Sequence, residues 1–129
     1  MKIYLITLCL MTTLSAAFAQ TGKPAWQEMK TFYSFMSSTF HPAEDGNFVP
    51  LKSKADSLLI TAKLWQASPI ASNYKPVETK AALQKLVKQC TLIKTAVKKN
   101  ASDEKLKKLI SDAHDIFHTI VGECRKADE

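Results

Sequence analysis

Apolar residues recur at steps of three and four along four stretches of the chain, the spacing that places side chains on one face of an α-helix. The stretches span about residues 24–40, 50–68, 77–99 and 102–124. We therefore predict four amphipathic helices. Their apolar stripes are Trp26, Met29, Phe32, Tyr33, Met36 and Phe40; Leu51, Ala55, Leu58, Leu59, Ala62 and Trp65; Leu83, Leu86, Val87, Cys90, Ile93 and Val97; and Leu106, Leu109, Ile110, Ala113, Phe117, Ile120, Val121 and Cys124.

Residues with strong positional preferences mark the ends of these helices. Pro24 and Pro50 suit first turns, and His41-Pro42 is expected to end the first helix because proline disfavours a helical conformation in the residue before it. Asn100 is expected to end the third helix. Ser102 is expected to cap the fourth helix, with two acidic residues following in its first turn.

No run of alternating β-branched residues competes with the helical pattern, so the predicted fold class is all-α. The short connection around Ala101 requires the third and fourth helices to lie antiparallel. We therefore predict an antiparallel up-down-up-down four-helix bundle around one apolar core. The alternative is a three-helix arrangement with a detached first segment, and the apolar stripe from Trp26 to Phe40 argues against it.

The first residues have the pattern of a signal peptide. Lys2 precedes a largely apolar run over 3–14, and Ala17-Phe18-Ala19 is the small-x-small pattern that a signal peptidase cuts. We expect residues 1–19 to be removed, leaving one domain over 20–129 in the periplasm or outside the cell. No later stretch approaches the length of a membrane-spanning segment.

Removal of this leader leaves two cysteines, Cys90 and Cys124, in a compartment that favours disulfides. Antiparallel packing about a turn near Ala101 offsets them by roughly 18 Å along the helices. A disulfide tolerates at most about 7 Å between Cα atoms. We therefore predict two separate thiols on core-facing positions.

Histidine and methionine supply the candidate chemistry. His114 and His118 lie four residues apart in the fourth helix, which places two imidazoles side by side, with His114 at the core margin and His118 more exposed. In an antiparallel pair of terminal helices, Met29 and Met36 bracket the levels of these histidines. Imidazole and thioether ligands hold copper or low-spin haem iron in exported proteins. His41 joins this set if the loop after the first helix folds back.

This layout resembles the periplasmic four-helix-bundle b-type cytochromes and the related cytochromes c-prime. The resemblance rests on a short exported chain, Met29 one turn into the first helix, and Phe117-His118 in the last helix. It implies haem b held between Met29 and His118. The Cys-x-x-Cys-His motif for covalent haem attachment is absent.

A copper or zinc ion is the alternative to haem. Its ligands would come from His114 and His118 with Met29, Met36 and His41. Either centre would serve electron transfer, storage or sensing. We do not expect an enzyme, because no Gly-rich phosphate loop, Gly-x-Ser-x-Gly elbow or pair of acids placed for hydrolysis is present.

The chain carries a formal net charge of +6 at pH 7. Six lysines cluster around the connection between the third and fourth helices, and an exported protein with such a tip favours an acidic periplasmic protein, anionic lipid or polysaccharide partner over nucleic acid. This gives a second hypothesis, a cofactor-free interaction or structural module that acts through its basic tip. A solvated tip with no partner is the alternative. The lysines are Lys94, Lys98, Lys99, Lys105, Lys107 and Lys108.

Overall fold

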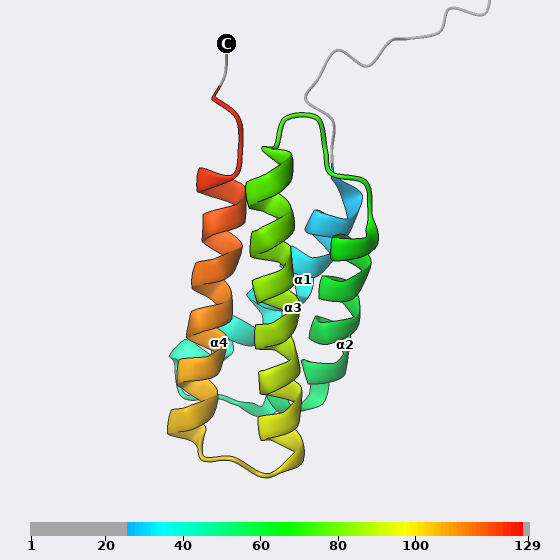
Figure 1. Ribbon diagram of the computed structural model, residues 1–129. Helices are drawn as coiled ribbons and strands as arrows, with labels where there is room; N and C mark the ends of the chain where they lie inside the picture. The colour runs from blue at the N-terminus through cyan, green and yellow to red at the C-terminus, as the bar shows by residue number, and fades with distance from the viewer. Residues whose placement is uncertain (1–25, 128–129) are drawn as a thin grey trace, which may run out of the picture.

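The computed structural model describes residues 26–127, and the regular structure in this range is helical (Figure 1). Helix α1 spans Gln27–Glu44, α2 spans Val49–Ala67, α3 spans Pro76–Lys98 and α4 spans Asp103–His118. A five-residue π-helix, η1 (Thr119–Glu123), continues α4 directly. The prediction of an all-helical fold with four helices is confirmed. The leader predicted over 1–19 lies outside the described residues.

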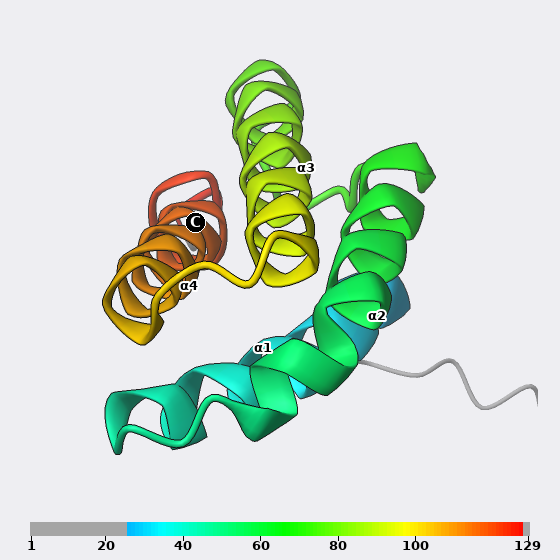
Figure 2. The same cartoon turned by 90° about the horizontal axis from the view of Figure 1, so that it is seen from below.

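The four helices pack consecutively. α1 contacts α2, α2 contacts α3, α3 contacts α4, and α1 also contacts α4. Viewed along the helices, α1 and α3 lie on opposite sides of the molecule (Figure 2). Within the described range, no helix is long and apolar enough to cross a membrane.

The end of α1 differs from the prediction. The helix does not stop at His41-Pro42 but continues through Pro42 to Glu44. Pro42 lacks an N–H group, yet its carbonyl oxygen accepts hydrogen bonds from the backbone N–H groups of Asp45 (3.1 Å) and Asn47 (2.9 Å), which hold the last turn together. His41 therefore lies on a helical turn and not in a loop.

The helix ends on either side of the connection between α3 and α4 follow the predicted signals, whereas Pro24, predicted in the first turn of the first helix, lies outside the described residues. The Ser102 hydroxyl oxygen accepts a hydrogen bond from the backbone N–H of Lys105 at 3.2 Å, which satisfies one free donor at the start of α4. Asn100 adopts a left-handed conformation with φ of 53° just after α3, as expected of a residue that ends a helix.

One apolar cluster fills the space between the helices, and aromatic rings form its centre. Trp65 and Phe32 are fully buried, with ring centroids 5.5 Å apart. Cys90 and Cys124 are both buried free thiols, as predicted. Burial raises the pKa of the Cys90 thiol to about 12.

Candidate metal centre

The centre of the candidate site is the histidine pair on α4. His114 and His118 lie on successive turns, and their Nε2 atoms are 3.1 Å apart. The ring centroids are 4.4 Å apart with the planes at 81°. His114 is half-buried and His118 is exposed, as the helical pattern predicted. Two imidazole nitrogens thus face each other at the surface of the molecule.

Phe40 of α1 packs against the His114 ring of this pair. Its ring stacks on the His114 ring with centroids 3.7 Å apart and an angle of 9° between the planes. Phe40 is itself buried, so the stack fixes the plane of the His114 ring. The sequence pattern places Phe40 only among the core residues and does not predict this contact, because the contact forms between two helices.

The surroundings of His114 favour its neutral form. Burial lowers the pKa of His114 most, and the neighbouring His118 lowers it further, while the carboxylates of Asp115 and Glu44 oppose these effects and His41 adds to them. A neutral imidazole keeps a lone pair on one ring nitrogen, and this lone pair is the group that binds a metal ion.

His41, the third histidine, does not join the pair. Its Nδ1 atom is 3.1 Å from a carboxylate oxygen of Glu44, one turn further along α1, and both side chains are exposed. The continuation of α1 through Pro42 creates this contact. The loop whose folding back would have brought His41 to the pair begins only after Glu44, so His41 stays on the helix.

The two methionines predicted as ligands have other neighbours. The Met29 sulfur accepts a hydrogen bond from the Tyr74 hydroxyl at 3.8 Å, and the Tyr74 ring packs against Trp26 at the start of α1. Met36 is 1% exposed and belongs to the apolar core.

Haem gripped by Met29 and His118 does not fit this arrangement. The His118 ring is turned toward His114. The space between α1 and α4 beside it is filled by aromatic rings, since Phe117 lies 5.5 Å from Tyr33 and 6.0 Å from Phe32 between centroids. A porphyrin would have to displace these rings.

Over residues 26–127, no three side chains of histidine, cysteine, aspartate or glutamate come together to enclose a metal ion. The histidine pair therefore offers two protein ligands and leaves further coordination positions to water or another molecule. Such an open arrangement suits reversible ion binding. Comparison with known proteins adds no assignment: no family model, curated protein or solved structure matches this chain.

Proposed function

We propose that this protein binds a transition-metal ion through His114 and His118, with copper(II) preferred over zinc(II). The role is binding, for electron transfer, storage or sensing, and not catalysis. The observation that carries the proposal is the separation of 3.1 Å between the two Nε2 atoms.

This separation suits two ligands on one ion. With metal–nitrogen bonds of about 2.0–2.1 Å, nitrogens 3.1 Å apart subtend an angle of about 98° at the ion. That angle lies between the right angle of square-planar coordination and the tetrahedral angle, so neither copper(II) nor zinc(II) requires the rings to move far. Copper(II) is favoured because nitrogen sites generally bind it more tightly than zinc(II).

The stack on Phe40 supports the proposal by reducing the cost of binding. A ring already held in one plane loses less side-chain freedom when it takes up an ion. The exposure of His118 gives the ion a route from solvent. The pair therefore combines one fixed ligand with one accessible ligand.

The proposal includes export and alternating helix directions. We infer that residues 1–19 are removed and that α1 to α4 run up, down, up and down. The short connections over 45–48, 68–75 and 99–102 support the alternation, because each leaves too little chain for a crossover along the bundle.

Copper titration of the mature chain tests the metal proposal. We expect one equivalent of copper(II) by calorimetry and an electron paramagnetic resonance spectrum with two nitrogen ligands. His114→Ala and His118→Ala should each weaken binding by more than about tenfold, since even outer-shell partners of metal ligands contribute that much. His41→Ala is the matched control and should change the affinity by less than about twofold.

Equal losses in all three histidine variants, or no copper binding by the wild-type chain, would contradict the proposal. Haem is tested separately by adding haemin and recording the visible spectrum. The proposal expects no Soret shift that depends on Met29. A shift abolished by both Met29→Ala and His118→Ala would replace the ion with haem.

A further inference from the structure

The excess positive charge of the chain is concentrated on one helix. Residues 75–99, which are α3 and one residue at each end, contain seven lysines and one glutamate. Subtracting these from the 18 basic and 12 acidic residues of the whole chain leaves 11 of each kind. The net charge of +6 therefore equals the charge of this segment, and the remaining chain is balanced.

The connection between α3 and α4 contributes less charge than its lysines suggest. The α4 side of this tip holds as many acids as lysines over residues 103–112. Lys108 pairs with Asp112 at 2.9 Å, and Asp103 pairs with Lys52 of α2 at 3.2 Å. The basic surface therefore extends along α3 and is not centred on the tip.

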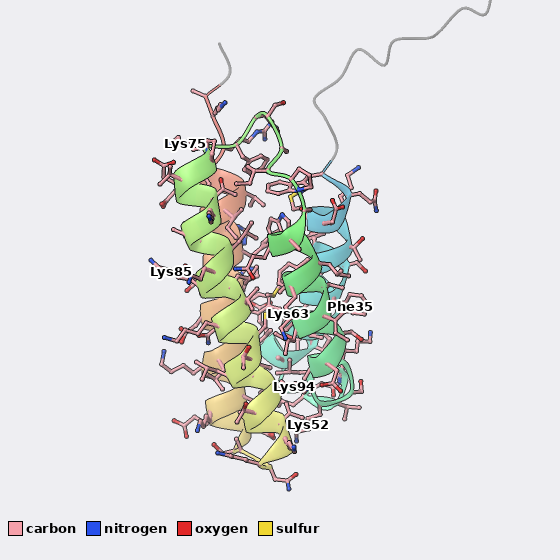
Figure 3. The ribbon with its side chains drawn as sticks, turned by 45° about the vertical axis from the view of Figure 1, so that its right-hand side comes forward. Phe35, Lys52, Lys63, Lys75, Lys85 and Lys94 are labelled. Carbon is pink, nitrogen blue, oxygen red and sulfur yellow. The ribbon has the colours of Figure 1, made fainter. Side chains whose placement is uncertain are left out.

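Most lysines of α3 face solvent. Lys94 pairs with Asp56 of α2 at 3.1 Å, and Lys75 donates to the backbone oxygen of Glu123 at 3.0 Å. The other five are exposed and form no ion pair within residues 26–127. Figure 3 shows Lys75, Lys85 and Lys94 at successive levels along α3. The five are Lys80, Lys85, Lys88, Lys98 and Lys99, called the lysine face below.

Two exposed aliphatic side chains lie on the same outward side. Val77 is 78% exposed and Leu92 is 47% exposed. Val77, Lys88 and Lys99 follow one another at steps of eleven residues, which returns a helix to almost the same direction, and Leu92 lies one turn after Lys88. The outward stripe of α3 thus combines ammonium groups with apolar tips.

We propose that the lysine face binds the protein peripherally to an anionic lipid surface. α3 is about 35 Å long at 1.5 Å per residue, so its charges are spread along a rod and do not converge on a pocket. Lysines distributed in this way match the phosphates of a lipid surface, while Val77 and Leu92 enter the headgroup region.

The composition of α3 argues against nucleic acid as the ligand. The helix contains no arginine, the side chain that forms bidentate hydrogen bonds to a phosphate. It also contains no aromatic residue that could stack on a base. The position of α3 opposite α1 also leaves the α1–α4 side, with its histidine pair, turned away from the lipid. Lipid binding is therefore independent of the metal proposal.

Vesicle sedimentation of the mature chain tests the lipid proposal. Vesicles containing phosphatidylglycerol should bind the protein, vesicles of phosphatidylcholine alone should not, and binding should weaken when salt rises above about 0.15 M. The double variant Lys85→Gln/Lys88→Gln should lower the partition coefficient by about 25-fold, or about fivefold for each lysine. Lys105→Gln/Lys107→Gln on α4 is the matched control, because it removes the same charge from exposed positions off the lysine face.

The control variant should keep most of the binding, and circular dichroism verifies that both variants are folded. Equal losses in the two variants would overturn the proposal, because binding would then depend on net charge alone. Binding to polyglutamate without binding to anionic vesicles would also overturn it, and would identify an acidic polypeptide as the partner. Leu92→Gln should lower vesicle binding without changing the net charge.

Discussion

At the scale of single residues, Phe40 organises the candidate site. Two histidine rings lie next to the Phe40 ring: His114 is stacked on it, and the His41 ring centroid is 5.4 Å from that of Phe40. His118 adjoins His114 in turn. A buried aromatic ring restricts a neighbouring imidazole without competing for its nitrogens. The metal affinity of the pair should therefore depend on a residue that binds no metal.

Phe40→Leu tests this dependence. Leucine keeps the site apolar but removes the flat surface on which His114 stacks. Because aromatic pairs contribute about 0.5–1.5 kcal/mol, we expect copper affinity to fall by about two- to twelvefold. Calorimetric titration measures the effect, and Phe48→Leu, a buried phenylalanine beyond the end of α1, serves as control. Unchanged affinity would show that the ring does not position His114.

The buried thiol of Cys90 should make stability depend on alkaline pH. Burial raises its pKa from 9.0 to about 12 in the folded chain. Above about pH 9 the unfolded chain loses this proton while the folded chain keeps it, so stability is full below pH 9 and falls as pH rises toward 12. At about pH 10.5 the loss is about 2 kcal/mol.

Urea unfolding at about pH 8 and pH 10.5 measures this loss, and Cys90→Ala isolates it. The variant should be less stable at the lower pH because of its cavity, but its stability should decline less between the two pH values. Equal declines in the two proteins would rule out the Cys90 thiol as the cause.

At the scale of helices, the end of α1 and the start of α4 are both held by hydrogen bonds within a few residues. Ser102 caps α4 through a bond within four residues, which the sequence pattern reveals. Pro42, by contrast, lies inside α1 because later backbone donors reach its carbonyl oxygen. The sequence rule for proline concerns the backbone conformation of the residue before it. The rule does not take into account the backbone N–H groups after Pro42 that bind its carbonyl oxygen.

Removal of the cap tests the local signal. Ser102→Ala should lower the free energy of unfolding by about 1 kcal/mol, because the first turn of α4 loses an acceptor. Ser34→Ala, at an exposed position inside α1, should have little effect or slightly stabilise the helix. Urea unfolding compares the two variants. A larger effect at Ser34 than at Ser102 would contradict the assigned cap.

At the scale of the whole molecule, the two proposals concern different sides. The histidine pair lies where α4 meets α1, and the lysine face lies on α3, which α1 does not touch. Lysines crowded along one helix repel each other in the folded chain more than in the extended unfolded chain.

Salt should therefore stabilise the fold. Raising the ionic strength from about 0.01 M to 0.15 M shortens the range of repulsion, and we expect the melting temperature to rise by about 2 °C. Lys85→Gln/Lys88→Gln should reduce this rise, whereas Lys105→Gln/Lys107→Gln, on a segment with balanced charge, should leave it. Differential scanning calorimetry measures both. A fall in melting temperature with salt would show that ion pairs such as Lys94–Asp56 outweigh the repulsion.

The pattern of residues along the chain predicts the four helices, the cap at Ser102, the separation of the two thiols and the adjacency of His114 and His118. These features depend on helical geometry over one turn or on large offsets along a helix, which an error of a few residues does not change. The packing between helices decides that Phe40 supports His114 and that Met29 contacts Tyr74. The His41–Glu44 contact lies within one helix and depends on the continuation of α1 through Pro42. Side chains in a helix point toward the N-terminus of that helix. Contacts between two helices therefore depend on the direction of the side chains and on how the two helices are aligned, and a shift of one turn changes which residues meet. The distribution of free charge also depends on the fold, because ion pairs between helices decide which lysine side chains stay unpaired and can bind a partner.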